Sequence, residues 1–445
     1  MTRFLLARIT RTRLASVVFA AGAFGLGACS PDEILEVVDP DIVDPTTISN
    51  AAGANALRAG ALARFNTATS GAESLFLYGG LLADEFRSSD TFSQRDETDQ
   101  RRIQLSNANI QGALRNAHGA RVSALQAAEA LQEFAPERRS EIAEMLLVQG
   151  YMENLMGEML CSGIPMSTPS TLGEPLPTAD VYARGIAHAD SAIAFAGTDA
   201  LGTRVKNAAA VVKGRALVNL NQYAQAATAV ATVATDFAYI HEQSQSTRTN
   251  GVWSLNINQR RYTLVDREGG NGLDYISAND PRIPVAAVTR GGGFDGNTDL
   301  YRQQIYPADG TSHPIMTGIE ARLIEAEALL ASNPTGALAK LNELRAASLR
   351  IGALTISNLP ALTLSTGRDA QVNQLFRERA FWMFATGHRL GDMRRLIRQY
   401  SRGAETVFPT GAFFKSGTYG PDLNIPVTQA EENNVNFTGC LDRNA

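Results

Sequence analysis

The sequence predicts a mainly α-helical protein, in which paired helices carry one irregular, loop-rich lobe. Two observations favour this fold class. Apolar residues recur at spacings of three and four over several long segments, and helix-capping residues stand where some of these segments meet. This periodicity lapses between about residues 243 and 314, where nine Gly and several aromatic residues occur. Residues 46–445 are therefore expected to form a single helical domain with its lobe at about 243–314.

Residues 1–28 are predicted to be a lipoprotein signal peptide. They begin with a region of four Arg and no acid, and an apolar run of 13 residues follows from Leu14 to Leu26. Such a run suits a signal peptide and is shorter than the ~20 residues that a membrane-spanning helix needs. Gly27 and Ala28 directly precede Cys29, as in a bacterial lipobox, whose cysteine carries the lipid. An ordinary signal peptide and a short membrane anchor are the alternatives.

Residues 29–45 are predicted to be an acidic tether. Ser30 to Pro45 holds six acidic residues and no basic one, a composition typical of an extended, self-repelling segment. Ser30 and the acidic run resemble the signals of lipoproteins that reach the outer face of the outer membrane. Acyl chains on Cys29 would anchor the protein, because each buried CH₂ contributes ~0.8 kcal/mol.

The composition disfavours nucleic-acid binding and enzymatic chemistry. The chain is 44% hydrophobic, which suffices for a large core, and its formal charge is −5. Cleavage before Cys29 would remove four Arg and no acid, leaving −9. Phosphate contacts need clustered Lys and Arg instead. Five His and three Cys offer little material for metal or nucleophile chemistry, so neither catalytic residues nor a metal or cofactor is expected.

Cys161 and Cys440 are the thiols that remain beside Cys29. In an oxidising compartment, two unpaired thiols are less expected than one bridge, so a Cys161–Cys440 disulfide is predicted. The alternative is two buried, unbonded cysteines. A bridge would fix the C-terminal tail to the first half of the chain.

Two helical hairpins are the clearest local features. In the first, one apolar face contains Met316, Ile319, Leu323, Ala326 and Leu330. Asn333-Pro334 then suits an N-cap followed by proline at the first helical position, which predicts a second helix over Thr335–Leu349. The other hairpin joins an apolar face over Val205–Leu220 to a helix that starts near Tyr223.

Further paired segments lie near 110–134 with 137–160, and at 179–196. These hairpins are tetratricopeptide-like, above all at Ala216–Ala226. Their spacing is uneven, so a regular solenoid is not predicted, and a plain helical bundle remains the alternative.

Aromatic and polar residues of the irregular lobe are the predicted ligand contacts. The hypothesis names Trp253, Arg260, Tyr262, Asp274 and Tyr275, since a sugar ring stacks its CH face on an aromatic ring while its hydroxyl groups need polar partners. The alternative is that these rings fix the loops to the helical core. The polar segment Leu81–Arg102 is a second irregular stretch with the same potential.

Several motifs stand in a fixed order along the chain. After the lipobox and the acidic tether come Asn279-Asp280-Pro281-Arg282, the helix Arg322–Ala328, Ala339–Arg345, Arg377-Glu378-Arg379, Gly387-His388-Arg389, Asp392, Arg394-Arg395, and the tail segments Asn424–Val427 and Glu431–Asn433. In this order they resemble the SusD/RagB family of nutrient-binding outer-membrane lipoproteins. The chain departs from the family at Leu390-Gly391, where aromatic residues are usual.

The resemblance implies a fold, a location and a role. It implies tetratricopeptide-like helices with an irregular ligand-binding lobe, a lipid anchor in the outer membrane that faces the cell exterior, and no catalytic activity. It also implies two kinds of partner: an oligosaccharide or peptide as ligand, and a SusC-like, TonB-dependent barrel transporter as the recipient. The rival hypotheses are a helical scaffold lipoprotein in outer-membrane protein assembly and a secreted hydrolase.

Three other motifs could indicate a metal or catalytic site, but each has a simpler interpretation. His241-Glu242 begins like a zinc-protease motif, but Gln245 stands where the second His is required. Asp295–Asp299 offers oxygen ligands for calcium but lacks the EF-hand spacing, so a plain turn is expected. His388-Arg389 is interpreted as structural, with Asp392 pairing with an arginine.

Overall fold

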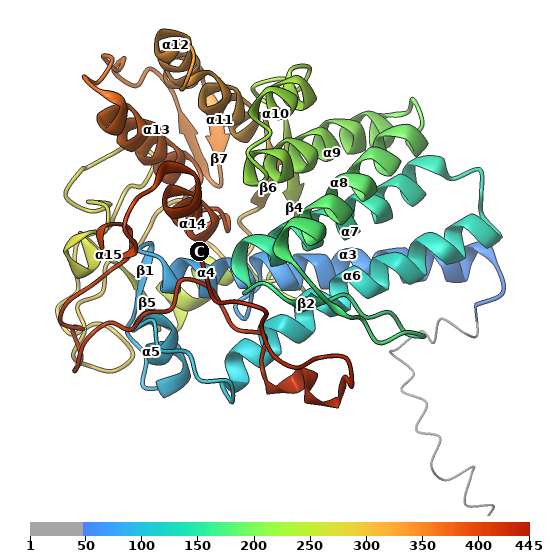
Figure 1. Cartoon of the computed structure of the whole chain (residues 1–445), viewed down its shortest axis with the longest axis horizontal. Coiled ribbons are helices and arrows are strands. Elements are labelled where there is room, and N and C mark those ends of the chain that lie inside the picture. The colour runs from blue at the N-terminus through green and yellow to red at the C-terminus, as the bar shows by residue number, and fades with distance from the viewer. Residues whose placement is uncertain (1–47) are drawn as a thin grey trace, which may run out of the picture. The chain divides into compact units, whose positions relative to one another are not determined.

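Helices that follow one another in sequence pack against one another through most of the chain (Figure 1). The computed structural model describes residues 48–445, so the signal peptide 1–28, Cys29 and the tether 29–45 lie outside the described residues. The packed series is α3 (Ala51–Ser70), α6 (Ala108–Phe134), α7 (Arg139–Met159), α8 (Thr178–Phe195), α9 (Ala200–Asn219), α10 (Tyr223–Val230), α11 (Gly318–Leu329) and α12 (Pro334–Ala346). The expectation of a mainly α-helical fold with tetratricopeptide-like hairpins is confirmed.

The α11–α12 hairpin shows how capping sets the helix ends. The Asn333 side chain accepts a hydrogen bond from the Gly336 backbone N–H at 2.9 Å, and Pro334 follows it, as predicted. Thr317 caps α11 in the same way. The predicted helix face began too early, because Met316 belongs to strand β6 (His313–Thr317). The second helix of the hairpin, α12, ends at Ala346 and not at Leu349 as predicted, because Leu349 belongs to strand β7 (Leu349–Ile351).

Short antiparallel strand pairs join the irregular segments. β1 (Phe86–Ser88) pairs with β5 (Tyr262–Leu264), which joins the polar segment after α4 (Leu75–Leu82) to the lobe. The other pairs are β2 (Ile164–Pro165) with β3 (Pro175–Leu176), β4 (Ala238–His241) with β6, and β7 with β8 (Leu354–Ile356). Between residues 243 and 314 the chain otherwise forms turns, a π-helix η2 (Trp253–Asn258) and a 3₁₀ turn η3 (Glu268–Gly270).

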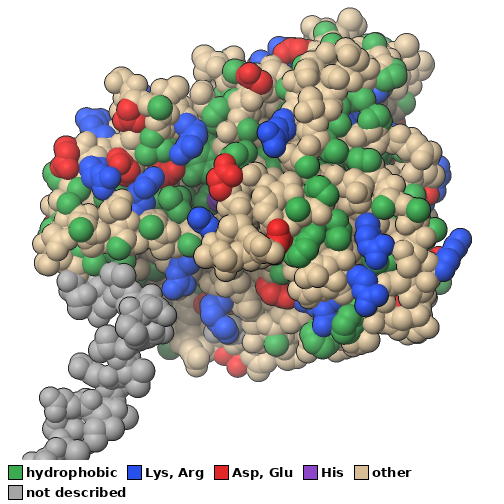
Figure 2. All heavy atoms as spheres, turned by 180° about the vertical axis from the view of Figure 1, so that it is seen from behind, with side chains coloured by type: hydrophobic (Ala, Val, Ile, Leu, Met, Phe, Trp, Pro, Cys, Tyr) green, Lys and Arg blue, Asp and Glu red, His purple; other side chains and the backbone are tan. Residues whose placement is uncertain are grey.

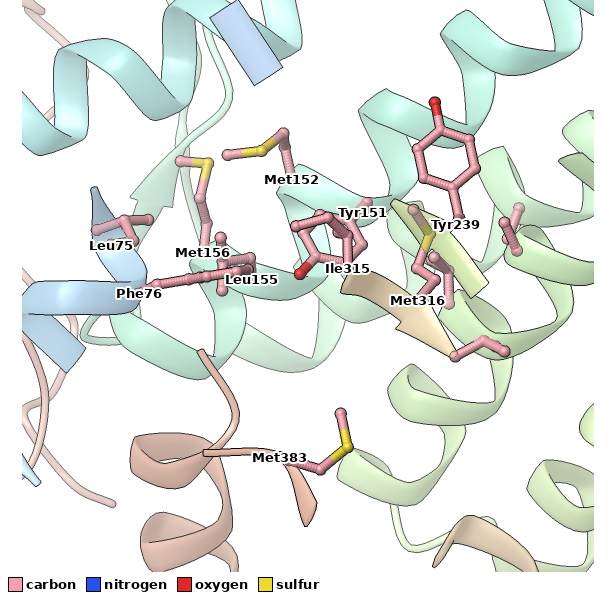
Figure 3. Close-up of a cluster of buried hydrophobic side chains, with 14 of the residues drawn as sticks. Leu75, Phe76, Tyr151, Met152, Leu155, Met156, Tyr239, Ile315, Met316 and Met383 are labelled. Atoms are coloured by element: carbon pink, nitrogen blue, oxygen red, sulfur yellow. The ribbon is translucent and has the colours of Figure 1, made fainter. Parts of the chain in front are cut away.

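The main hydrophobic core lies between the helices. Figure 3 shows its centre, where α7 supplies Tyr151, Met152, Leu155 and Met156, and Leu75 and Phe76 of α4 approach from one side. Unbranched methionines suit such a place, because they fill irregular gaps between elements that are not evenly spaced. A second cluster lies under the lobe and includes Leu81, Phe86, Tyr262, Tyr275 and Phe381.

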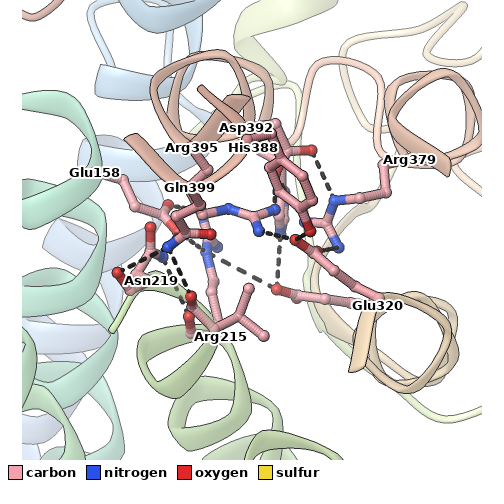
Figure 4. Close-up of polar contacts among 12 residues, drawn as sticks. Glu158, Arg215, Asn219, Glu320, Arg379, His388, Asp392, Arg395 and Gln399 are labelled. Atoms are coloured by element: carbon pink, nitrogen blue, oxygen red, sulfur yellow. Dashed lines mark hydrogen bonds and ion pairs between the residues drawn. The ribbon is translucent and has the colours of Figure 1, made fainter. Parts of the chain in front are cut away.

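A buried network of charged side chains holds α13 (Arg368–Trp382) and α14 (Arg389–Tyr400) onto α7, α9 and α11 (Figure 4). The Arg215 Nε atom lies 2.9 Å from Glu158, and the Asn219 amide donates to the same carboxylate at 2.7 Å. His388 Nε2 lies 3.0 Å from Glu320. Burial alone would raise the pKa of Glu320, but His388 and Arg215 outweigh it and hold that pKa below its usual range. His388 is thus a structural residue within the described chain.

The turn between α13 and α14 requires glycine at one position. Gly387 has a φ of 74°, and a Cβ atom there would lie 2.2 Å from the Phe76 ring. Only glycine combines this left-handed conformation with so close an approach. The Gly387-His388-Arg389 motif therefore has a packing role: it brings α14 down onto α4.

The C-terminal segment runs back across the helices. It contains α15 (Ala404–Val407) and the 3₁₀ turn η4 (Gln429–Asn433), and a disulfide joins Cys440 to Cys161, with their Cα atoms 5.9 Å apart. The Cys161 N–H also donates to the Ile425 carbonyl at 2.9 Å. Within residues 48–445, no helix combines the length and apolar character needed to cross a membrane.

Candidate functional site

A groove of about 930 Å³ opens between three segments that are distant in sequence. Its lining residues come from β1 and the polar stretch after it, from the lobe, and from a C-terminal loop. Ile276 and Tyr301 also line a second hollow of about 380 Å³, beside Pro284 and Val288. Its lining combines apolar, aromatic and charged side chains: Arg87, Asp90, Asp96, Leu264, Val265, Asp266, Ile276, Asp295, Asp299, Tyr301, Phe414 and Lys415.

One end of the groove is formed by an arginine stacked on an aromatic ring. The Arg87 guanidinium lies 4.2 Å from the centre of the Phe414 ring, and its Nε donates to buried Glu268 at 2.9 Å. Burial, together with Glu268, raises the pKa of nearby Asp99 well above its usual value. The Glu268 carboxylate lies 2.6 Å from the Arg87 guanidinium and so fixes the arginine beside the Phe414 ring.

Lys415 closes the groove on the side of the C-terminal loop. Its ammonium donates to the Asp90 carbonyl at 2.6 Å and to the Asp96 carboxylate at 2.7 Å, and lies 3.6 Å from Asp295. These contacts fix a loop from the end of the chain against α5 (Ser93–Asp99) and the lobe. The site thus depends on the folded position of the C-terminal segment.

Two exposed rings stand beside the groove on either side of one arginine. Phe92 is 48% exposed and Phe294 is 42% exposed, and within residues 48–445 these are the aromatic side chains that the solvent reaches most freely. The Arg261 guanidinium lies 4.7 Å from the Phe92 ring centre and 3.8 Å from that of Phe294, and it also pairs with Asp90. This cation–π stack holds both rings in place.

Two of the predicted ligand contacts are wrong. Tyr262 and Tyr275 are fully buried, so neither ring face can meet a ligand. The Tyr275 ring centre lies 5.3 Å from that of Phe381 and 5.2 Å from that of Phe384, both on the helical side. These tyrosines attach the lobe to the helices, which is the alternative that the sequence left open.

The other three predicted contacts lie outside the groove. Trp253 is half-buried at the start of η2, and Arg260 is exposed with one N–H directed to the Gly292 carbonyl. Asp274 pairs with Arg377 of α13. None of the five predicted residues lines the groove, although the flagged segment Leu81–Arg102 contributes one of its walls.

Sequence reasoning missed Tyr301, Phe414, Lys415 and Asp266. The signal that could have found Phe414 and Lys415 is the run Phe413-Phe414-Lys415 between Gly411 and Gly417, an aromatic loop tip with a charge. The hydrophobic periodicity gave no reason to place this loop beside residues 87–96, because the two segments meet only in the folded chain.

The Asp295–Asp299 loop is a turn, as expected, and its carboxylates are already used. Asp295 Oδ1 accepts from the backbone N–H groups of Asn297 and Thr298, at 3.0 and 2.8 Å, and Asp299 Oδ1 accepts from Gly291 N–H at 3.0 Å. In the part of the chain that the structure describes, no group of three or more His, Cys, Asp or Glu side chains is arranged to hold a metal ion.

The groove has the chemistry of a binding site for a polar, ring-containing molecule. Tyr301 and Phe414 offer aromatic surface, and the carboxylates, Arg87 and Lys415 offer acceptors and donors. Its volume lies in the range usual for small-molecule sites. The lining includes neither His nor Cys.

On the face seen in Figure 2, Lys and Arg side chains lie among Asp and Glu side chains, and neither sign covers a continuous region. A phosphate backbone would need a continuous basic surface, which this face does not offer.

Comparison with known proteins identifies the fold. No protein-family model and no curated protein sequence matches the chain. Solved structures do match it. A SusD superfamily protein from Parabacteroides distasonis superposes with a TM-score of 0.65 at 14% identity, over 88% of this chain and 99% of that one. One from Bacteroides thetaiotaomicron gives 0.65 at 13%, over 88% and 100%.

A third structure, described as a SusD-like carbohydrate binding protein from Bacteroides vulgatus, gives a TM-score of 0.58 at 12% identity, over 78% of this chain and 83% of that one. The chain therefore has the SusD-like fold.

Proposed function

We propose that this chain, with its SusD-like fold, is a surface lipoprotein that binds a nutrient oligosaccharide in the groove and delivers it to a TonB-dependent outer-membrane transporter. The observation that carries the proposal is the groove of about 930 Å³, with Phe414 and Tyr301 among charged side chains. Saccharide rings need this combination, because they present apolar CH faces and hydroxyl groups together.

Two further observations support an oligomeric ligand. The second hollow shares Ile276 and Tyr301 with the groove, so the two together offer space along a track rather than in one closed pocket. The similar Bacteroides vulgatus structure is described as carbohydrate binding. A short peptide is the other ligand that such a track could hold.

The lipid anchor is part of the proposal. Cys29 and the acidic residues after it suit a lipidated, extended tether of about 17 residues, which could reach about 55 Å when extended. Acyl chains on Cys29 would keep the chain attached to the membrane without a spanning helix.

The proposed role is binding without turnover. The groove carboxylates other than Asp266 lie in ion pairs with Arg or Lys side chains, which leaves them poorly suited to act as general acid and base. Sustained product formation by the purified chain would argue for the hydrolase hypothesis instead.

Co-purification from native outer membranes tests delivery. A C-terminally tagged chain is extracted in mild detergent, and its partners are identified by mass spectrometry. We expect the wild type to co-purify with a TonB-dependent barrel in near-stoichiometric amount. With Cys29→Ala, we expect the tagged chain itself to be lost from the membrane fraction. Recovery of envelope-assembly proteins without a barrel would favour the scaffold hypothesis.

A further inference from the structure

The cations that line the groove, Lys415 and Arg87, both lie beside carboxylates. Lys415 lies 2.7 Å from the Asp96 carboxylate and 3.6 Å from that of Asp295. The Arg87 guanidinium is 2.6 Å from Glu268, which is almost fully buried behind it. These cations therefore present little unbalanced positive charge to a ligand.

Two other carboxylates of the lining are also paired with side chains of opposite charge. Buried Asp90 is paired with both Arg95 and Arg261. Asp299 is paired with Arg290 and also accepts a backbone N–H. Neither carboxylate adds much net negative charge to the groove.

Asp266 is the exception among the acidic residues that line the groove. Within residues 48–445, no Lys, Arg or His nitrogen lies within 4.0 Å of its carboxylate, and the adjacent Arg267 is directed to Asp274 instead. Asp266 Oδ1 accepts N–H groups from Ile276 and Ser277, at 3.1 and 2.9 Å, and the Ser277 hydroxyl at 3.1 Å. These bonds hold an uncompensated negative charge at a fixed position in the groove wall.

This inference rests on the proposed function. We propose that the Asp266 carboxylate makes the groove discriminate between saccharides by their charge. Neutral saccharides and saccharides with a protonated amino group bind more tightly than uronic-acid or sulfated saccharides of the same length. A fixed carboxylate repels a ligand anion a few ångströms away and attracts an ammonium group, and each effect amounts to about three- to tenfold in affinity at a partly solvated site.

A glycan array tests the proposal with two matched variants. The array presents neutral, amino-bearing, uronic-acid and sulfated oligosaccharides to the wild type, to Asp266→Asn and to Asp236→Asn. Asparagine keeps the Oδ1 acceptor for the Ile276 and Ser277 N–H groups, so the turn is retained. Asp236 is exposed on a turn away from the groove, and its variant changes the net charge equally.

We expect the wild type to bind neutral or amino-bearing glycans. Asp266→Asn should gain about three- to tenfold in affinity for anionic glycans and lose as much for amino-bearing ones, while Asp236→Asn should match the wild type. A wild type that prefers uronic-acid or sulfated glycans would overturn the proposal, as would identical charge preferences in the two variants. Binding to no glycan at all would instead overturn the proposed function itself.

Discussion

Arg379 of α13 and Asp392 of α14 form a paired hydrogen bond inside the helical core. The guanidinium donates from Nε to Oδ2 at 2.8 Å and from Nη2 to Oδ1 at 2.9 Å, and both side chains are only 4% exposed. Arg395 donates to the same carboxylate at 2.7 Å. Burial opposes ionisation, but the two arginines outweigh it and hold the pKa of Asp392 far below its usual value. The negative charge of Asp392 thus joins two helices.

Replacing Asp392 with asparagine should destabilise the protein strongly. The change leaves two buried guanidinium groups without their shared carboxylate, which costs about 3–5 kcal/mol of unfolding free energy. Urea denaturation monitored by far-UV circular dichroism measures this loss. As a control, Asp299→Asn breaks the Arg290 pair, whose arginine is 80% exposed, and should change stability by less than about 1 kcal/mol. Equal effects in the two variants would contradict the structural role of Asp392.

Glu85 should make stability depend on pH. It is buried beside the α13–α14 turn, where its Oε1 accepts the Ala385 N–H at 2.9 Å, and burial raises its pKa from 4.5 to about 8. Between these pH values the folded state keeps a proton that the unfolded state loses, so the free energy of unfolding falls as pH rises, by as much as about 5 kcal/mol. Above the folded pKa the fall stops.

Glu85→Gln removes this proton exchange and keeps an acceptor for Ala385. Its unfolding free energy should therefore stay flatter from pH 4.5 to pH 8 and exceed that of the wild type at the upper end. Parallel denaturation series at several pH values provide the comparison. An equal change of unfolding free energy with pH in the two proteins would show that Glu85 titrates normally.

The Cys161–Cys440 disulfide should stabilise the fold and hold the C-terminal tail against the first half of the chain. It links residues 279 apart, and a native disulfide of this kind contributes about 2–5 kcal/mol. Reductant should lower the melting temperature of the wild type but not that of the double variant Cys161→Ala/Cys440→Ala. Alkylation of both cysteines in the native, unreduced protein would show that the bond does not form.

Glycan affinity should depend on the aromatic residues of the groove and not on the buried tyrosines. Phe414→Ala and Tyr301→Ala remove ring surface from the lining and should each weaken binding by about tenfold, or about 1.4 kcal/mol. Tyr275→Phe should leave affinity within about twofold, because it removes only a buried hydroxyl that has no hydrogen-bond partner among residues 48–445. Calorimetric titration with a glycan that the wild type binds compares the three. A larger loss from Tyr275→Phe would return the site to the residues first predicted.

The sequence predicted those parts of the fold that local rules determine. Asn333-Pro334 predicted a helix start because the Asn333 side chain and the Pro334 ring are together enough to begin a helix. The observed cap confirms this prediction. The ends near Met316 and Leu349 were wrong because strand pairing takes both residues out of the helices. Met316 pairs with Tyr239, which is distant in sequence, and Leu349 pairs with Ile356 in a short hairpin. Local periodicity carries no information about such partners.

The ligand contacts were predicted less well, for a related reason. Tyr262 and Tyr275 are residues of the type expected in a sugar site, but aromatic side chains also form part of the core that attaches the loop-rich lobe to the helices. The groove itself combines residues near 90, 266, 301 and 415. Such a combination exists only after folding, so no spacing within one segment could have revealed it.

The position of a bound saccharide shows whether the groove is the binding site. The mature chain is crystallised with an oligosaccharide that it binds on the array, and the ligand is located in the electron density. We expect a sugar ring against Phe414 and Tyr301, with hydroxyl groups within hydrogen-bond distance of the lining side chains of the groove. A saccharide bound elsewhere on the chain, with an empty groove, would contradict it.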